Sequence, residues 1–330
     1  MRAVVVHEFG PVDSHRIEEI AAPRPQPGEV AIDVHAIGVN FPDTLMVQGL
    51  YQKKPDRPFT PGRDAAGVIS AVGDGVSRFK PGDRVTALVT YGAYAEQCIA
   101  PESRCFLLPE GMDFVTAAGM TTSYLTAWVG LMVRGQYQTG EKVLVLGAAG
   151  GVGLSAVQIA KAKDAFVIGG DLTEEKRQLA TTNGADAAVD LSADEIRESL
   201  RQQVFAVTGG QGVDIVMDPI GGDIFDAAIR TLAFAGRIIC IGFVAGIPTA
   251  RPNYFTVKNL TLAGLATDHY FDHRPELIQQ AVTDIFKMHA AQQITPAIMK
   301  TYPLESFQTA LDLFAKKKSI GKIVLTTSRS

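Results

Sequence analysis

Residues 143–153 read VLVLGAAGGVG, a run of apolar side chains that ends in a loop almost devoid of them. The loop fits the dinucleotide pattern G-x-G-x-x-G with alanine in the first position. Small residues there allow a tight turn and let backbone N–H groups approach a pyrophosphate, which the N-terminus of a following helix attracts. The alternative is a glycine-rich packing turn without a ligand. Because a strand is predicted before the loop and an amphipathic helix after it, the pattern predicts a dinucleotide site. The residues predicted to contact the dinucleotide are Ala148, Gly150, Gly151, Val152 and Gly153.

The next predicted strand bears on which dinucleotide is bound. Asp171 follows this strand, 18 positions after Gly153, close to the spacing of the acidic residue that bonds the ribose 2′-hydroxyl of NAD. A carboxylate there repels the 2′-phosphate of NADP, whereas Lys176 and Arg177 in the following helix could neutralise it. Both basic residues could equally belong to a solvated helix face. The charges favour NADH slightly, and the choice between NADH and NADPH stays open.

From about residue 121 onward the sequence alternates helices and strands, beginning with a helix at 121–133. Alternation of this kind specifies a parallel sheet covered by helices on both faces, which is the doubly wound α/β fold. The predicted strands are 143–147, 165–170, 187–191, 213–219 and 237–242, with a sixth at 259–265. The predicted helices between them are 151–163, 174–183, 194–208 and 222–232.

Residues 1–120 follow a different pattern, in which β-branched or alternating runs are separated by Pro/Gly turns. This pattern favours a β-rich barrel or sandwich. At the other end of the chain we predict helices near 274–290 and 304–317, then a closing strand at 321–327 that packs back on the first domain. We therefore expect two domains. The β-rich one is discontinuous, and the domain bounds are 1–122 with 266–330 for it and 123–265 for the dinucleotide-binding one.

Composition limits the classes of partner. The chain has 330 residues, three cysteines and a formal net charge of −4. An odd number of cysteines without C-x-x-C spacing argues against a disulfide framework and favours the cytoplasm. The stretch MRAVVVHEFG (1–10) reads as a strand rather than a signal peptide, and no apolar run approaches the ~20 residues of a membrane span. The acidic balance does not attract nucleic acid or anionic membranes, so small molecules and a second copy of the chain are the expected partners.

Eight motifs are spread over nearly the whole chain: VNFPDTLMVQGLY (39–51), PFTPGRDAAGVISAVGDGV (58–76), FKPGDRV (79–85), YGAYAEQ (91–97), LVLGAAGGVGLSAVQIAKA (144–162), NGADAAVD (183–190), DPIGG (218–222) and GKIVL (321–325). In combination they resemble the zinc-free quinone oxidoreductase (zeta-crystallin-like) branch of the medium-chain dehydrogenase/reductase superfamily. The resemblance implies a GroES-like catalytic domain enclosing a Rossmann domain, with the active site in the cleft between them. It also implies a homodimer joined edge to edge through residues 245–265.

The resemblance bears on metal binding as well. Zinc alcohol dehydrogenases of the superfamily place a cysteine before the Asp of the VNFPD region, use G-H-E in place of residues 62–64, and carry four clustered cysteines. This chain has no cysteine before Cys98, and Arg63 replaces the histidine ligand. Zinc needs three or four converging ligands, so we expect no metal. We interpret His269 and His273, which are spaced i,i+4, as surface histidines.

Without zinc, the resemblance implies that Tyr51 polarises the substrate carbonyl. A phenol can hydrogen-bond an oxygen on which negative charge develops and then supply a proton; otherwise Tyr51 is an exposed loop aromatic. Asn40 and Asp43 match positions that line the nicotinamide side in the family, and Asp43 could instead be a turn residue. Arg63 is unusual for the family. We expect it to pair with Asp64, or alternatively to favour an anionic substrate such as an acyl-CoA.

The resemblance favours NADPH, because the family generally prefers it and rarely has an acid at the position of Asp171. Four further residues are assigned to the cofactor through the resemblance. Thr126 matches a threonine that reaches the nicotinamide carboxamide, although a hydroxyl bonded to its own helix is the alternative. Gly242 and Phe243 follow a predicted strand, where ligands of such sheets bind. Lys322 matches the family's C-terminal lysine and could otherwise be a solvated side chain.

The sequence thus predicts an NAD(P)H-dependent enzyme that transfers a hydride to a quinone without a metal. Reduction of an enone or enoyl thioester in the same site is one alternative. A catalytically silent NAD(P)H-binding sensor or structural protein is the alternative from another class. Substitution of Tyr51 or of the glycine loop would have favoured the silent protein, and both are intact.

Overall fold

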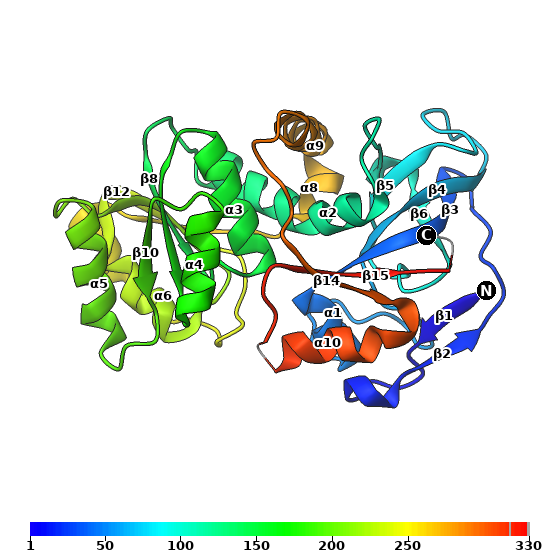
Figure 1. Ribbon diagram of the computed structural model, residues 1–330, viewed down its shortest axis with the longest axis horizontal. Coiled ribbons are helices and arrows are strands. Elements are labelled where there is room, and N and C mark those ends of the chain that lie inside the picture. Colours follow the sequence, from blue (N-terminus) through cyan, green and yellow to red (C-terminus); the bar gives the residue numbers. More distant parts are fainter. Residues whose placement is uncertain (317, 329–330) are drawn as a thin grey trace. The chain divides into compact units, whose positions relative to one another are not determined.

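A computed structural model describes residues 1–316 and 318–328 (Figure 1). The chain forms two compact units, the first made of Met1–Thr122 with Pro296–Ser330 and the second of Ser123–Thr295. The division at 122/123 is where the sequence places it. The second division lies at 295/296 rather than at 265/266, so residues 266–295 are part of the second unit. The reason is that helix α9 (Pro275–Ala290) packs on a π-helix of that unit, η3 (Val129–Arg134).

The second unit is built on a six-stranded, fully parallel sheet. Its strands in chain order are β8 (Lys142–Leu146), β9 (Phe166–Asp171), β10 (Ala187–Asp190), β11 (Val213–Asp218), β12 (Leu232–Cys240) and β13 (Thr261–Gly264). In space the order is β10-β9-β8-β11-β12-β13, which places β8 and β11 side by side at the switch point of a dinucleotide-binding sheet. All six strands and the doubly wound fold predicted from the sequence are confirmed.

Helices cover both faces of this sheet. The crossover helices are α3 (Gly151–Ala162), α4 (Glu174–Thr182), α5 (Ile196–Val207) and α6 (Gly222–Ile229), close to the predicted ranges. Figure 1 shows α3 and α4 on one side of the strands and α5 on the other. Because β8 is covered on both sides, Val143 to Leu146 are all completely buried, which explains the unbroken apolar run.

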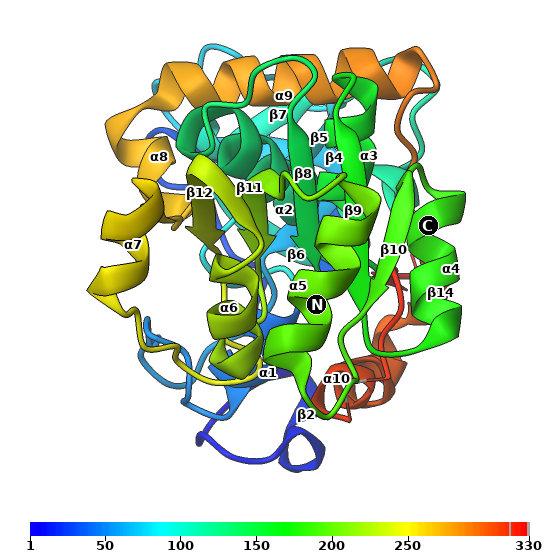
Figure 2. The same cartoon turned by 90° about the vertical axis from the view of Figure 1, so that its left-hand side faces the viewer.

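The helices at the ends of the second unit were predicted less well. The helix predicted at 121–133 is α2 (Phe114–Trp128), which continues into the π-helix. It begins earlier because Asp113 caps it, accepting the Thr116 N–H at 2.8 Å and the Thr116 hydroxyl at 2.7 Å. Two short helices were not predicted, α7 (Pro252–Lys258) and α8 (Asp268–His273). Helix α8 leads directly into α9 (Figure 2).

The first unit is β-rich, as expected. Strands β14, β15, β3, β4, β5 and β7 form a sheet in that order, β6 pairs with β3, and β1 pairs with β2. The bounds are β1 Arg2–Val5, β2 Arg16–Glu19, β3 Glu29–Val39, β4 Asp64–Val72, β5 Arg84–Leu88, β6 Gln97–Pro101, β7 Cys105–Leu107, β14 Ile298–Pro303 and β15 Lys322–Thr326. Its described residues also include the helices α1 (Phe41–Val47) and α10 (Phe307–Ala315). Residue 317, the last of the helix predicted at 304–317, lies outside the described residues.

The closing strand makes the first unit discontinuous. Strand β15 pairs antiparallel with β3, with Ile323 opposite Val39 and Val324 opposite Gly38. This pairing confirms the prediction that the end of the chain returns to the first domain. It also sets Lys322, at the start of β15, beside the end of β3, from which α1 follows.

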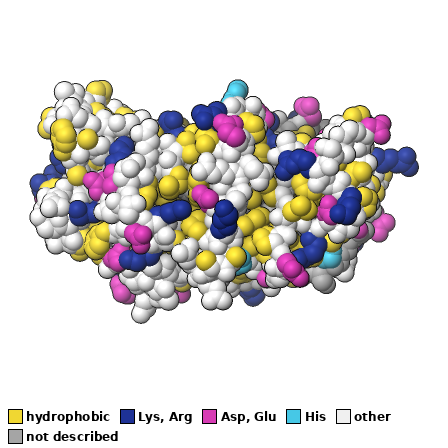
Figure 3. Space-filling view, turned by 90° about the horizontal axis from the view of Figure 1, so that it is seen from above, with side chains coloured by type: hydrophobic (Ala, Val, Ile, Leu, Met, Phe, Trp, Pro, Cys, Tyr) yellow, Lys and Arg dark blue, Asp and Glu magenta, His cyan; other side chains and the backbone are white. Residues whose placement is uncertain are grey.

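Two observations concern the surface. Among residues 1–316 and 318–328, no helix combines the length and the apolar character needed to cross a membrane. On the face drawn in Figure 3, Lys and Arg side chains are interspersed with Asp and Glu. Such mixing differs from the single-sign stripe of a nucleic-acid-binding face.

Candidate active site

The glycine loop joins β8 to α3 in the second unit. Gly150 is the N-cap of α3 and has extended backbone angles. A Cβ added to Gly153 would lie 2.0 Å from the Gly147 carbonyl oxygen, so only glycine allows this close approach of helix and strand. Ala148 is buried and donates its N–H to the Gly170 carbonyl at 3.1 Å. Helix α3 thus begins at this loop, and the N–H groups in the first turn of a helix are the donors that a pyrophosphate site requires.

Asp171, at the end of β9, is turned into this loop. Its Oδ2 accepts the Ala149 N–H at 3.0 Å and its Oδ1 accepts the Leu172 N–H at 2.8 Å. The residue is only 5% exposed. An ionised carboxylate can accept about four hydrogen bonds, so Asp171 fixes the loop and retains acceptor capacity for ribose hydroxyls.

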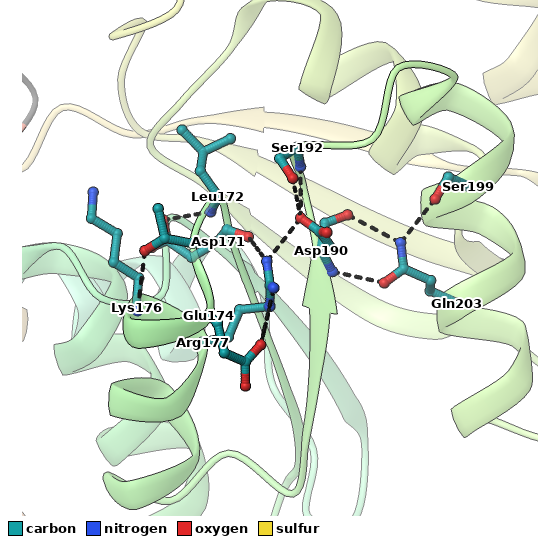
Figure 4. A network of polar contacts seen from close by, with 10 residues as sticks. Asp171, Leu172, Glu174, Lys176, Arg177, Asp190, Ser192, Ser199 and Gln203 are labelled. Carbon is teal, nitrogen blue, oxygen red and sulfur yellow. Dashed lines mark hydrogen bonds and ion pairs between the residues drawn. The ribbon is translucent and has the colours of Figure 1, made fainter.

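The two basic residues after Asp171 behave differently (Figure 4). Arg177 bonds Glu174 at 3.0 Å and Asp190 at 2.8 Å, and its Nη1 also donates to the Asp171 carbonyl oxygen at 3.3 Å. Its charge is thus already matched by two carboxylates. The Lys176 N–H is capped by a threonine hydroxyl at 3.3 Å, while its ammonium group points away from Arg177.

The remaining cofactor candidates of this unit lie on α2 and after β12. The Thr126 hydroxyl accepts a hydrogen bond from the Thr267 hydroxyl at 3.1 Å. Gly242 and Phe243 follow β12, and the Gly242 N–H donates to the Asp218 carbonyl oxygen at 3.4 Å. Neither Thr267 nor Asp218 is predicted from the sequence. The motif DPIGG, which begins with Asp218, offered a signal for the second, whereas nothing local marks Thr267.

Asp218 closes the turn after β11. Its Oδ1 accepts the N–H groups of Ile220 and Gly221, both at 2.9 Å, and its Oδ2 is buried without a hydrogen-bond partner among the described residues. Burial raises the pKa of this carboxyl group. The turn thus places a buried acceptor at the carboxyl end of the sheet, where ligands of this fold bind.

In the first unit, the side-chain amide of Asn40 is hydrogen-bonded through both its nitrogen and its oxygen. Its Nδ2 donates to Asp64 Oδ2 at 2.9 Å and to the Gly38 carbonyl oxygen at 3.2 Å, and its Oδ1 accepts from Lys322 Nζ at 2.8 Å. The side-chain amide therefore has both of its N–H groups engaged inside the unit. Asn40 is also the N-cap of α1, so the arrangement fixes where this helix begins.

Lys322 and Asp64 complete this buried cluster. The Lys322 ammonium is 3.9 Å from Asp64 Oδ2 and also donates to the Val39 carbonyl oxygen at 3.2 Å. Burial lowers the pKa of Lys322, and the nearby carboxylates of Asp64 and Asp43 partly offset that effect. Asp64 also accepts from the Thr122 hydroxyl. Lys322 is thus no solvated side chain, and Thr122 is a member that nothing in the sequence marks.

Asp43 is the third residue of α1 and completely buried. Its Oδ2 accepts the Asn40 N–H at 2.8 Å and the Tyr94 hydroxyl at 3.1 Å, while its Oδ1 has no hydrogen-bond partner among the described residues. Burial raises its pKa to about 7. Asp43 is therefore a capping residue within α1 rather than a turn residue, and its carboxyl group titrates near neutrality. Tyr94 was not selected from the sequence, although it lies in the motif YGAYAEQ.

Tyr51 follows α1 and is half-buried against the core of the first unit. Its N–H donates to the Leu45 carbonyl oxygen at 3.2 Å, which fixes the backbone. Its hydroxyl oxygen accepts a hydrogen bond from Arg63 Nη1 at 3.2 Å. The structure thus joins Arg63 to the phenol that the resemblance selects, a contact that the sequence analysis did not foresee.

The described residues contain no group of three or more His, Cys, Asp or Glu that could hold a metal ion. His269 and His273 lie one turn apart on α8, with ring centroids 6.3 Å apart, and both are exposed. This placement is that of surface histidines.

The position of Asp43 predicts a pH dependence of stability. The pKa of Asp43 rises from 3.8 in the unfolded chain to about 7 in the folded one, so the folded protein holds the proton more tightly. This contribution to stability is fully present below pH 3.8 and is lost as pH rises through about 7. Between pH 5 and 7, stability relative to Asp43→Asn should fall by up to about 1.4 kcal/mol per pH unit. The asparagine oxygen can still accept from Asn40 and Tyr94. Urea unfolding of both proteins from pH 5 to 8 measures the difference, and parallel curves would contradict the assignment.

Comparison with known proteins places the chain in a family. Residues 26–133 match the alcohol dehydrogenase GroES-like domain, and residues 151–284 match the zinc-binding dehydrogenase domain. Quinone oxidoreductase-like protein 2 of Bos taurus is 37% identical over 94% of this chain and 88% of its own length. A mycobacterial protein solved with NADPH is 32% identical with a TM-score of 0.92, covering 99% of this chain and 100% of that one.

Two further solved structures are similar over nearly their full lengths. Escherichia coli quinone oxidoreductase complexed with NADPH is 28% identical with a TM-score of 0.91, covering 99% of this chain and 100% of that one. CurK enoyl reductase is 26% identical with a TM-score of 0.88, covering 99% of each chain. These similarities agree with the parallel sheet order and the β-rich first unit. The chain is therefore an oxidoreductase that belongs to the quinone oxidoreductase branch of the medium-chain dehydrogenase/reductase superfamily.

Proposed function

We propose that the protein transfers a hydride from NAD(P)H to a quinone. The observation that carries the proposal is the Tyr51 hydroxyl, held by a buried guanidinium at 3.2 Å in a chain that also has a dinucleotide loop. Relatives over nearly the full length of the chain are named quinone oxidoreductases, and two similar structures are of complexes with NADPH. These similarities support both the acceptor and the nicotinamide cofactor.

In the proposed reaction, the residues of the chain stabilise developing charge and donate one proton. A bound reduced nicotinamide supplies a hydride, which carries two electrons and one proton. As the hydride forms a bond to one quinone oxygen, both carbonyl π bonds break, the ring becomes aromatic and negative charge develops on the second oxygen. Tyr51 donates a hydrogen bond to that oxygen and then its proton, which gives the hydroquinone, and water restores the phenol proton. Preorganised donors of this kind stabilise developing charge strongly.

We propose that no metal takes part in this reaction. The carbonyl is polarised instead by the Tyr51 hydroxyl, which accepts a hydrogen bond from the Arg63 guanidinium. Arg63 is 7% exposed, so its charge is little screened by water. A fixed cation and a phenol together supply what a Lewis acid supplies in the related zinc enzymes.

For the cofactor, we propose a preference for NADH. Asp171 is buried and unpaired by any cation that the structure shows, and it keeps acceptor capacity for the ribose hydroxyls. A 2′-phosphate would meet this carboxylate, and Arg177 is already engaged by Glu174 and Asp190. Of the two basic residues that follow Asp171, this leaves Lys176 to offer a charge. The charges around Asp171 thus disfavour the 2′-phosphate of NADPH, although structures of similar proteins contain NADPH.

Reduction of an enone or enoyl thioester is a second candidate. The similarity to CurK enoyl reductase favours it. The same phenol would stabilise an enolate oxygen as hydride reaches the β-carbon. The two functions therefore differ in the acceptor alone, and a direct comparison of acceptors separates them.

We also propose that the protein is a homodimer joined through the β13 edge. Strand β13 ends the parallel sheet, and Leu262 on it is 42% exposed. Ile247 and Val257, in the segment before β13, are 84% and 80% exposed. An unpaired strand edge with exposed apolar side chains is commonly covered by another chain, here a second copy of the protein.

We propose a cytoplasmic location because the cysteines are free thiols. Cys98 and Cys105 are buried free thiols and Cys240 is half-buried and free, which suits a reducing compartment. Cell fractionation of the protein checks the location.

The first prediction concerns Tyr51. With menadione and the preferred nicotinamide, Tyr51→Phe should lower kcat about 100-fold, because general acid assistance is of that order, and leave the cofactor Kd unchanged. Tyr91→Phe, an exposed tyrosine of the same unit, should match wild type. Dialysis against a zinc chelator should not change the rate. Turnover with a simple enone or crotonyl-CoA but not with menadione would favour the second candidate. Cofactor binding without turnover would favour the silent protein.

The second prediction concerns Asp171. Serine can still accept the Ala149 N–H but carries no charge. Asp171→Ser should therefore lower the ratio of kcat/KM for NADH to that for NADPH by about 10- to 100-fold, which corresponds to roughly 1.4–2.8 kcal/mol. Asp194→Ser, an exposed carboxylate of the same unit, serves as the matched control. An unchanged ratio would show that Asp171 does not select the cofactor.

The third prediction concerns the β13 edge. Light scattering with size exclusion should give a dimer for wild type and a monomer for Ile247→Glu with Leu262→Glu. Phe234→Glu, which removes a 74% exposed side chain on β12, should leave the dimer intact. A monomeric wild type, or a dimer that survives the double substitution, would refute this interface.

A further inference from the structure

Arg63 projects from a rigid segment of backbone. Gly62 before it has φ of +93°, and a Cβ there would lie 2.1 Å from the Tyr94 ring, so this turn requires glycine. The Gly62 carbonyl accepts the Ala93 N–H at 3.2 Å, and the Arg63 carbonyl accepts the Val89 N–H at 2.8 Å. Two consecutive peptide groups are thus tied to the facing segment. The root of the guanidinium side chain is fixed from both sides.

The surroundings of Arg63 favour a strong interaction with Tyr51. Two cations, Arg63 and Lys322, and two acids, Asp43 and Asp64, are buried in the first unit. Arg63 acts on Asp43 through its charge, yet burial still raises the pKa of Asp43 to about 7. Because buried charges interact through a low effective dielectric, the Arg63 guanidinium favours negative charge on the Tyr51 oxygen to which it donates.

The hydrogen bond itself has a direction. Arginine only donates, so the Tyr51 hydroxyl oxygen must accept from Arg63 Nη1. With one lone pair of the oxygen committed to the guanidinium, the phenol proton must point away from it. A hydrogen bond from a charged donor also polarises the O–H group that accepts it. Tyr51 is thereby held as a donor toward whatever lies on its other side.

We propose that Arg63 is a positioning residue for the reaction, which directs and polarises the Tyr51 hydroxyl toward the acceptor oxygen. The proposal rests on the proposed quinone reduction. Arg63 exchanges no proton: the hydride and its two electrons come from NAD(P)H, and the proton comes from Tyr51. The role of Arg63 is exerted through the phenol.

A double-mutant cycle tests this coupling. Arg63→Met keeps length and apolar bulk but removes the donor and the charge. It should lower kcat with menadione at least 10-fold, with the cofactor Kd unchanged. In the Tyr51→Phe background the same substitution should lower kcat less than twofold, because the hydroxyl on which it acts is gone. Arg63→Lys should recover part of the rate. Multiplicative effects of the two substitutions, or an unchanged kcat in Arg63→Met, would overturn the proposal.

A measurement that needs no turnover separates this proposal from the proposed function. With tyrosine labelled at Cζ, the NMR resonance assigned through Tyr51→Phe should shift in Arg63→Met. It should stay in place in Arg24→Met, an exposed arginine of the same unit. An unmoved resonance in Arg63→Met would overturn the proposal, whatever the activity. A wild type inactive on every acceptor would instead refute the quinone reduction and leave the hydrogen bond to be judged by this spectrum.

Discussion

The hydrogen bond from the Lys322 ammonium to the Asn40 amide joins residues 282 positions apart and holds the first unit's polar cluster together. A buried ammonium is costly unless it is paired and hydrogen-bonded. Asn40, the Val39 carbonyl and Asp64 meet that requirement. Because the Asn40 amide is then fixed, so is the start of α1, and with it Asp43 and the turn that carries Tyr51. The position of the Tyr51 phenol, the proposed proton donor, thus depends on a strand at the far end of the chain.

The second unit is organised by local constraints instead. The loop from β8 to α3 is shaped by its own residues, since Gly153 must lie against the Gly147 carbonyl. Asp171 reaches the loop from the neighbouring strand β9 and bonds the Ala149 N–H. The Asp171 carboxylate therefore braces the loop. Under the proposed preference for NADH it also sets the charge that a ribose or its 2′-phosphate meets, so serine, which keeps a hydrogen-bond acceptor, is a more informative substitution than alanine.

The observed contacts of Arg63 bear on the proposed chemistry of the site. On sequence grounds it was expected to pair with its neighbour Asp64 or to attract an anionic substrate. In the structure Asp64 is occupied by Asn40, Thr122 and Lys322, and Arg63 donates to Tyr51. The hydrogen bond to the phenol is an interaction that neither expectation included, and the proposed role of Arg63 rests on it.

By itself, the sequence determined the doubly wound sheet, its glycine loop and the return of the last strand. These features are written in local patterns, such as apolar runs buried on both faces and a turn that only small residues allow. Only the tertiary structure decided which distant segments contact one another, because the periodicity of a sequence does not encode such contacts. Thr122, Tyr94 and Thr267 joined the candidate site through contacts between distant segments, with no local signal in two of the three cases. Residues 266–295 joined the second unit because α9 packs on the π-helix. Hydrogen-bond partners and packing faces are properties of the assembled chain, so the partner of Arg63 could be known only from the fold.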